Sequence, residues 1–295
     1  MIGLITSVKR LETHDGAGIR TTVFLKGCPL KCKWCHNPEN LDTQIKIGYK
    51  ESKCIGCGLC VNSCKNGVHT ITNGVHSVDF SSCVGCGKCV DACPTEAITL
   101  YGKKVTAEEL FSQLILDKFL FDTSNGGVTF SGGEPLVQSD LLVEVLKRLK
   151  RDGINCNIDT SGFVDYSAFS KTLPFTDCYL YDIKHIDSDI HYKGTGVNNE
   201  SIIENLLRLD ADGGKTEIRI PLIPNFNDDE STINKIGKLL STLKNCVGVK
   251  VLSYHSLAKS KCQSVGKEFI EFSNGNLNKK DAQKILSKYV KIIND

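Results

Sequence analysis

The sequence of 295 residues has almost no net charge and no long hydrophobic run. Lys and Arg number 36 against 34 Asp and Glu, which leaves a formal charge of +2 and no electrostatic case for nucleic acid or an anionic membrane. No apolar run reaches the roughly 18 residues of a transmembrane helix. Residues 1–10, MIGLITSVKR, also lack the apolar core of a signal peptide. We therefore expect a cytoplasmic protein that contacts neither membrane nor nucleic acid.

Cysteine, by contrast, is abundant: the chain has 15, and most of them fall in three tight groups. Without an export signal, and in a chain of this size, metal ligation in a reducing compartment explains such groups better than disulfides do. The cysteines outside the groups are expected to be ordinary thiols. They are Cys156, Cys178, Cys246 and Cys262.

Hydrophobic residues form 40% of the sequence, enough for a sizeable core, and the length suits one barrel-like domain with an insert. Residues 19–26 are β-branched and apolar and predict a strand. Later in the chain helical segments alternate with strands at 128–132, 154–162, 178–185, 216–224 and 247–255. These strands with crossover helices predict an α/β fold with a parallel sheet, either doubly wound or a partial (β/α) barrel. In both, the chemistry lies at the carboxyl ends of the strands.

One pattern of four cysteines occurs twice, as CIGCGLCVNSC at 54–64 and CVGCGKCVDAC at 83–93. This spacing matches the two-cluster run of bacterial ferredoxins, in which the fourth cysteine of each run ligates the other cluster. We therefore expect two [4Fe–4S] clusters here, with zinc or disulfides as the alternative. The ligand sets are Cys54, Cys57, Cys60 and Cys93 for one cluster, and Cys83, Cys86, Cys89 and Cys64 for the other.

The first group, Cys28-x3-Cys32-x2-Cys35, holds only three thiols. A [4Fe–4S] cluster held by three thiolates leaves one iron with an open position, the feature that separates catalytic from closed structural metal sites. A small molecule can bind to that iron and receive an electron. The two clusters with complete ligand sets have no such position and suit electron transfer.

The three-cysteine run resembles that of the radical S-adenosylmethionine superfamily, in which the free iron chelates the amino and carboxylate groups of that cofactor. The longer pattern Gly16-x-Gly18-x-Arg20-x3-Phe24-x2-Gly27-Cys28-x3-Cys32-x2-Cys35-x-Asn37 is similar to the signature of the activating enzymes of glycyl radical enzymes. Related motifs extend to His255, so the resemblance covers nearly the whole chain. It implies a partial (β/α)6 barrel built from residues 1–46 and 103–295, with a ferredoxin-like insert at 47–102.

The resemblance also implies a reaction on a protein. In the family, a reduced cluster gives S-adenosylmethionine one electron, and the resulting 5′-deoxyadenosyl radical takes hydrogen from a glycine Cα of a partner glycyl radical enzyme. The cofactors would be three [4Fe–4S] clusters and S-adenosylmethionine, with a monovalent cation as a further candidate. We expect a flavodoxin or ferredoxin as reductant, an anaerobic cytoplasm and a monomer. The sequence does not say which lyase, dehydratase or decarboxylase is the partner.

Most of the site residues implied by the resemblance follow the ends of strands. Gly132, Gly133 and Glu134 would hold the amino group of the cofactor, and Lys184 its carboxylate. Carboxylates and a hydroxyl at neighbouring strand ends suit a hard cation with oxygen ligands. The matching family positions are Asp159, Thr160, Asp182 and Ile183. Taken alone, an Asp at a strand end is equally compatible with a helix cap.

Other implied residues lie elsewhere in the chain. Trp34 and His36 are expected to line the adenine, with simple packing as the alternative for Trp34, and His255 is expected near the ribose. Arg219 would either bind the cofactor or form an ion pair inside the barrel. Asp15 would seat the glycine loop of the partner. Together with Cys28, Cys32, Cys35 and Lys184, Asp15 makes up the expected catalytic set.

Two other functions compete with protein activation. One is a radical enzyme that acts on a small molecule or a peptide, and the Gly16–Asn37 signature argues against it. The other is a pure electron-transfer protein, which would have no use for Gly132–Glu134, Asp182 or Lys184. The role of the paired clusters, as an electron relay or as a docking module, is left open.

Overall fold

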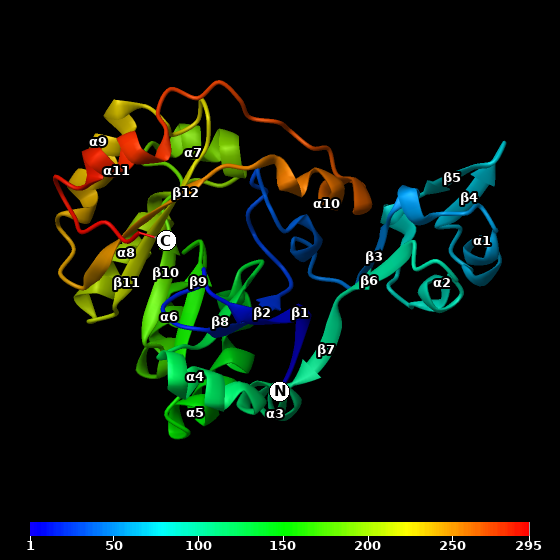
Figure 1. Cartoon of the computed structure of the whole chain (residues 1–295), viewed down its shortest axis with the longest axis horizontal. Helices are drawn as coiled ribbons and strands as arrows, with labels where there is room; N and C mark the ends of the chain where they lie inside the picture. The colour runs from blue at the N-terminus through cyan, green and yellow to red at the C-terminus, as the bar shows by residue number, and fades with distance from the viewer. Residues whose placement is uncertain (295) are drawn as a thin grey trace.

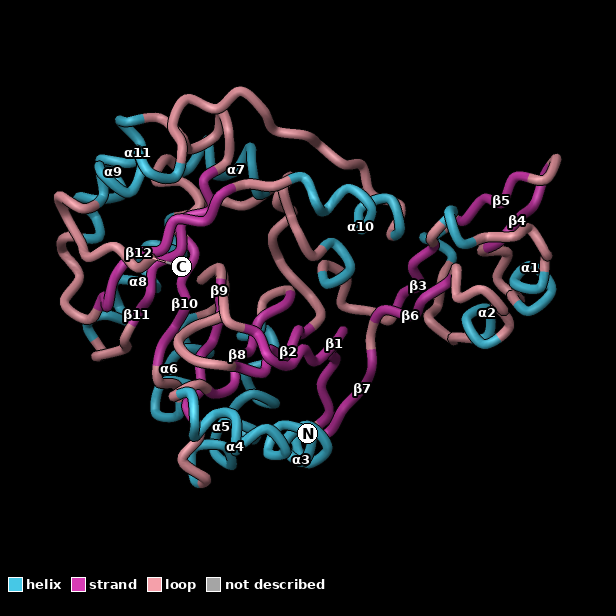
Figure 2. The backbone as a smooth tube through the Cα atoms, viewed as in Figure 1, coloured by secondary structure: helices cyan, strands magenta, loops and turns pink. Residues whose placement is uncertain are grey.

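An eight-stranded sheet forms the main body of the protein (Figures 1 and 2). The computed structural model describes residues 1–294. The strand order is β12-β11-β10-β9-β8-β2-β1-β7, so β12 and β7 are the edges of an open, partial barrel. Six strands run parallel, as predicted: β2 (Arg20–Leu25), β8 (Gly127–Gly132), β9 (Asn155–Thr160), β10 (Cys178–Asp182), β11 (Thr216–Leu222) and β12 (Cys246–Ser253).

Two antiparallel strands extend this sheet and were not predicted. β1 (Ile2–Glu12) pairs with β2 on one side and with β7 (Lys103–Thr106) on the other. β7 has only four residues, two of them lysines, and such short charged strands are typical of exposed sheet edges. The pairing of Ile2 with Thr106 returns the chain to the barrel directly after the insert.

Helices cover the outer face of the sheet (Figure 1). α5 shows why they form: Leu141, Leu142, Val145 and Leu149 recur at helical spacing and are buried against the sheet, while charged residues face outward. The outer helices are α3 (Ala107–Leu114), α4 (Lys118–Ser124), α5 (Ser139–Arg151), α6 (Tyr166–Thr172), α8 (Glu200–Ala211), α9 (Glu230–Leu240) and α11 (Lys279–Leu286). No helix among residues 1–294 combines the length and apolar content needed to cross a bilayer.

The last helix is shorter than the sequence indicated. Helical periodicity predicts a helix near 279–292, whereas α11 ends at Leu286. Beyond it the chain forms a parallel bridge between Ile292 and Val249 of β12. Backbone pairing with the edge strand therefore replaces the expected last turns of helix.

The insert stands to one side of the barrel (Figure 1). At its base β3 (Lys46–Tyr49) pairs antiparallel with β6 (Ile98–Tyr101), and a second hairpin joins β4 (His69–Thr72) to β5 (Val75–Val78). Its two short helices, α1 (Leu59–Ser63) and α2 (Lys88–Asp91), each begin after a glycine with positive φ, Gly58 at 75° and Gly87 at 79°. The repeated cysteine pattern therefore corresponds to a repeated backbone conformation.

Candidate active site

The three-cysteine loop follows β2 and is anchored at several points along its length. The Gly27 N–H donates to Asn40 O at 2.7 Å and the Cys28 N–H to Leu41 O at 3.1 Å, so the loop closes on itself. Lys31 N–H and Lys33 N–H donate to Thr195 O and Gly194 O at the end of α7 (Ser188–Thr195). These backbone bonds hold the cysteines above the carboxyl ends of the parallel strands.

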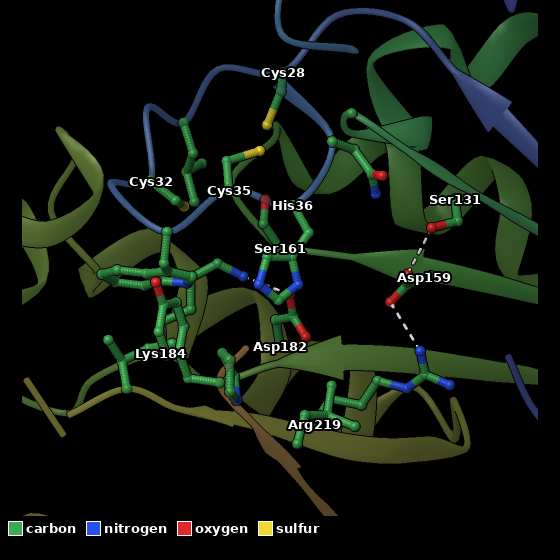
Figure 3. Close-up of a pocket in the computed structure, with 18 of the residues that line it drawn as sticks. Cys28, Cys32, Cys35, His36, Ser131, Asp159, Ser161, Asp182, Lys184 and Arg219 are labelled. Carbon is green, nitrogen blue, oxygen red and sulfur yellow. Dashed lines mark hydrogen bonds and ion pairs between the residues drawn. The ribbon is translucent and has the colours of Figure 1, made fainter. Parts of the chain in front are cut away.

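The three thiols face one another in a partly desolvated space (Figure 3). Burial raises the pKa of Cys28 to about 12 and also raises the pKa of Cys32 and Cys35. Without a metal they would stay protonated, because a buried thiolate is costly. A bound metal removes the proton. Three soft ligands that need a metal to ionise fit an iron–sulfur cluster.

A cavity of about 510 Å³ opens beside these thiols, which is within the usual range for a cofactor site. It brings together most of the residues singled out in the sequence. The predicted residues that line it are Cys28, Cys32, Trp34, Cys35, His36, Gly132, Gly133, Asp159, Thr160, Asp182, Lys184, Arg219 and His255. Residues from all six parallel strands or their following loops therefore meet in one site.

Glu134 lies outside the cavity lining and is fully buried. Its Oε1 accepts hydrogen bonds from Thr160 Oγ1 and Leu136 N, and its Oε2 from Ser161 N and Ser161 Oγ, all within 3.2 Å. Burial raises the pKa of Glu134, against the lowering effect of these bonds. The expectation that this carboxylate receives an ammonium group is not supported by the geometry. Glu134 instead positions the loop after β9. Of this motif, Gly132 and Gly133 line the cavity.

Asp159 and Arg219 form the polar floor of the cavity. Ser131 Oγ donates to Asp159 Oδ2 at 2.7 Å, and Arg219 Nη1 lies 3.7 Å from Asp159 Oδ1 (Figure 3). Burial raises the pKa of Asp159 to about 7, although the Arg219 charge acts in the opposite direction. Arg219 also pairs with Glu217 at 3.3 Å and with Asp15 at 3.7 Å. Arg219 therefore forms the ion pairs expected inside the barrel, and because it also lines the cavity its binding of the cofactor stays a prediction.

Lys184 is almost completely buried and forms an ion pair with Asp182. Burial lowers the pKa of Lys184, but the Asp182 carboxylate and the nearby Cys32 outweigh it, so the pKa is raised overall. The ion pair with Asp182 therefore favours the charged ammonium form in the cavity wall. A carboxylate of a small ligand would find there a positively charged partner.

Aromatic rings form the wall opposite the strands. The rings of His36 and His255 are stacked with centroids 4.0 Å apart, and burial next to His255 lowers the pKa of His36 to about 4. Trp34 packs on Phe226 at 4.5 Å and still lines the cavity. Flat aromatic groups of this kind suit an adenine ring.

Besides Glu134, two implied residues do not line the cavity. The side chain of Ile183 belongs to the hydrophobic core and its N–H donates to Arg219 O at 2.9 Å, so only its carbonyl oxygen could serve the expected cation. Asp15 accepts a hydrogen bond from Thr22 Oγ1 at 2.7 Å and pairs with Arg219 on the inner side of the sheet. Its expected role toward a partner glycine loop stays a prediction.

Lys261 is a site residue that the sequence reasoning missed. It lies on α10 (Lys259–Ser264), more than two hundred residues from the cysteine loop, and its Nζ donates to His36 O at 3.2 Å and to Asn37 Oδ1 and Glu39 Oε1 at 2.9 Å. One ammonium group thus clamps three successive parts of the loop behind Cys35. The motif SYHSLAKSK pointed to this region only through His255.

Replacing Lys261 with Met is expected to weaken S-adenosylmethionine binding about tenfold, because charge-assisted hydrogen bonds of this kind are worth about 1.5–3 kcal/mol. The loop would lose its clamp while its cysteine ligands stay in place. Titration of the cofactor-induced change in the EPR spectrum of the reduced protein measures this affinity. The control is Lys259→Met, an exposed position on the same helix, which should bind as the parent does. Equal affinities in both variants would contradict the clamp.

The paired cysteine groups meet across the two repeats. A small cavity in the insert is lined by Cys54, Cys57 and Cys60 of the first run together with Cys93 of the second. In the other group, burial and then the charges of Cys64, Cys83 and Cys86 raise the pKa of Cys89 to about 11. These four cysteines therefore lie close to one another. We call these four-cysteine groups the first cage (Cys54, Cys57, Cys60, Cys93) and the second cage (Cys83, Cys86, Cys89, Cys64). Their composition has the crossed arrangement expected of a two-cluster ferredoxin.

An open parallel barrel with three cysteines beyond its first parallel strand defines the class of protein. A family model described as a 4Fe-4S single cluster domain matches residues 14–186. The fold is similar to that of a radical SAM methyltransferase from Sphaerobacter thermophilus, with a TM-score of 0.55 at 14% sequence identity over 98% of this chain and 76% of that one. The class is therefore that of proteins with a 4Fe-4S single cluster domain, on a fold similar to that of a radical SAM enzyme.

Relatives in sequence narrow this class. The choline trimethylamine-lyase activating enzyme of Oleidesulfovibrio alaskensis is 38% identical over 96% of this chain and 93% of its own length. The trans-4-hydroxy-L-proline dehydratase activating enzyme of Clostridioides difficile is 38% identical over 90% and 89%, and the 4-hydroxyphenylacetate decarboxylase activating enzyme of the same species is 37% identical over 92% and 88%. The chain belongs to the family of activating enzymes of glycyl radical enzymes, as the sequence resemblance implied.

Proposed function

We propose that this protein installs a radical on a glycine of a partner glycyl radical enzyme. The observation that carries the proposal is the cavity of about 510 Å³ in which three cysteines, two strand-end glycines and the Asp182–Lys184 pair face one another. When bound, the cluster and S-adenosylmethionine supply the one-electron cleavage that yields methionine and the hydrogen-abstracting 5′-deoxyadenosyl group. The protein supplies orientation and exclusion of water.

Each part of the cavity has a role toward the cofactor. Cys28, Cys32 and Cys35 hold the cluster, and the backbone of Gly132 and Gly133 accepts the amino group. Lys184, kept charged by Asp182, binds the carboxylate. His36, His255 and Trp34 enclose the adenosine. Glu134 acts indirectly, because three of its hydrogen bonds hold Thr160 and Ser161 in place.

We further propose that the insert carries two [4Fe–4S] clusters, one in each cage, which brings the total to three. A protein reductant of the flavodoxin or ferredoxin type would supply the electron, and the protein would act as a monomer in an anaerobic cytoplasm. The crossed grouping of the cysteines supports the two clusters.

The test of activation is EPR spectroscopy under anaerobic conditions. The protein is incubated with S-adenosylmethionine, dithionite and, in turn, a glycyl radical lyase, dehydratase and decarboxylase, the kinds of enzyme named for its relatives. We expect a glycyl doublet in the EPR spectrum with one of these enzymes. The same mixture made with the Cys28→Ala variant of this protein should give no doublet. Deoxyadenosine without a doublet in any mixture would favour action on a small molecule or peptide. No cleavage of the cofactor at all would favour electron transfer alone.

Asp159 and Thr160 at the end of β9 and Asp182 at the end of β10 are proposed to hold a monovalent cation beside the cofactor. Because burial places the pKa of Asp159 near 7, protons compete with the cation below that pH. We expect the potassium concentration for half-maximal cofactor binding to rise about fivefold between pH 7 and pH 6, and to change little above pH 8. Asp159→Asn should remove this pH dependence, whereas Asp152→Asn, at an exposed position, should keep it. The same potassium requirement at every pH would contradict the assignment.

A further inference from the structure

The first cage has a polar wall that the ligand assignment does not explain. The His76 ring on β5 lies between two of the thiols, with Nδ1 at 3.5 Å from Cys54 Sγ and Nε2 at 3.7 Å from Cys60 Sγ. Tyr49 meets the same ring edge-on, with centroids 4.5 Å apart. His76 and Tyr49 both line the cavity that the four cysteines enclose. An imidazole is therefore in hydrogen-bonding range of cluster ligands at this cage.

A second histidine determines which way the His76 ring donates. His69 Nδ1 lies 3.1 Å from His76 Nε2, and His69 is buried. A thiolate that binds iron can only accept a hydrogen bond, so the N–H of His76 that faces Cys54 has to be the donor. Nε2 is then free to accept the N–H of His69. The two imidazoles form a short chain of hydrogen bonds that ends on a cysteine sulfur.

The internal repeat shows that the second cage lacks this arrangement. Counting from the fourth cysteine of each run, Ile71 after Cys64 corresponds to Leu100 after Cys93. On the paired strands, His76 faces Ile71 as Ile47 faces Leu100, so Ile47 is the counterpart of His76. Ile47 is apolar and buried in the core of the insert, and its side chain has no N–H to donate. In the second cage the backbone supplies a hydrogen bond instead: the Gly85 N–H donates to Cys83 Sγ at 3.4 Å.

The first cage is also the one farther from the barrel. A side chain at Gly85, in the second run, would collide with Ile45 O in the segment that leads from the barrel. At Gly56, the counterpart in the first run, nothing lies within 4 Å. Phe80, just before Cys83, packs against Gly266 of the segment after α10. Figure 1 shows the same order, with α1 on the outer side of the insert and α2 on the inner side.

We propose that His76 donates a hydrogen bond to the Cys54 sulfur of the first cage and gives the cluster of this cage the more positive reduction potential of the two auxiliary clusters. This inference rests on the proposed presence of both clusters. Reduction adds negative charge to a cluster, and an N–H aimed at a ligand sulfur stabilises that charge, so such bonds raise the potential. An electron that enters the insert therefore resides on the outer cluster.

The test is an EPR-monitored redox titration of the full-length, cluster-loaded protein with His76→Ile, which copies the residue of the second half. We expect one auxiliary transition to move to a more negative potential, with the ratio of reduced to oxidised cluster about tenfold lower at a given potential, or 59 mV for one electron. The other auxiliary transition and the catalytic one, recognised by its response to S-adenosylmethionine, should stay in place. His76→Gln, which keeps an N–H donor, should recover part of the shift.

Ser77→Ile is the matched control, because it introduces the same residue on the opposite, exposed face of β5. An equal shift in this variant, or no shift in His76→Ile at full iron content, would overturn the inference and leave the three clusters standing. An iron content of about four per chain would instead overturn the proposed auxiliary clusters. If His76→Ile loses iron, pulsed EPR of the native protein with ¹⁵N-labelled histidine decides. A ¹⁵N coupling to an auxiliary cluster is expected, and its absence would overturn the role of His76.

Discussion

Replacing Cys28, Cys32 and Cys35 together with Ala is expected to abolish cleavage of S-adenosylmethionine and to lower the iron content from about 12 to about 8 per chain. The three thiols belong to one loop above the cavity, and their raised pKa values mean that they serve as ligands only when a metal ionises them. The cages of the insert lie on a separate set of strands and helices. They should therefore retain their iron.

Iron analysis after anaerobic reconstitution, together with chromatography of deoxyadenosine, measures both effects. Cys178→Ala is the control, because this half-buried cysteine lies outside all three groups and should keep the full iron content and the activity. A triple variant with undiminished iron would show that the catalytic ligands have been misassigned. A loss of all iron would show that the insert cannot fold around its clusters without the barrel site.

Replacing Glu134 with Gln is expected to destabilise the protein by about 3 kcal/mol and to lower the melting temperature by about 5–10 °C. The Glu134 carboxylate accepts from Leu136, Thr160 and Ser161 in a place without solvent. Glutamine puts an NH2 group against at least one of these donors, which leaves buried N–H or O–H groups without an acceptor. The loop after β9 should shift, and cofactor affinity should fall with stability.

Thermal unfolding under anaerobic conditions tests this prediction. Glu144→Gln is the matched control, since Glu144 is partly exposed on α5 and pairs with the N-terminal amine at 3.2 Å. An exposed pair of this kind contributes about 0–1 kcal/mol, so the melting temperature should hardly change. Glu134→Gln could instead keep the melting temperature of the parent and lose only cofactor affinity. That result would support the direct contact with the cofactor's amino group that the sequence led us to expect.

Local motifs predicted the chemistry of this protein well. Ligands such as Cys28, Cys32 and Cys35 are only a few residues apart, and chain connectivity alone keeps such residues close enough to bind one cluster. The grouping of residues at the strand ends was also predictable, because alternating strands and helices impose a parallel sheet whose carboxyl ends share one edge. Gly132, Asp159, Asp182 and Lys184, taken from three separate segments, do line one cavity.

The same motifs did not predict in which direction the side chains at this edge of the sheet point. Glu134 belongs to the strand-end motif SGGEP, yet its carboxylate turns away from the cavity to meet Thr160 and Ser161 of the next strand. Ile183 lies between two cavity residues, but its side chain points into the core because neighbouring residues of an extended chain alternate in direction. Motifs identify a segment as functional, and packing decides which of its atoms face the ligand.

The sequence by itself determined the family, the parallel barrel, the insert and the cysteine groups, because each depends on spacing within a short stretch of chain. Only the tertiary structure decided the contacts between distant segments. It brought Lys261 to the loop at His36, paired β1 with β7 across the insert, and placed His76 beside Cys54 but Ile47 in the corresponding place of the other half. Such contacts depend on how strands and helices pack after they form, and no local pattern of residues records that packing.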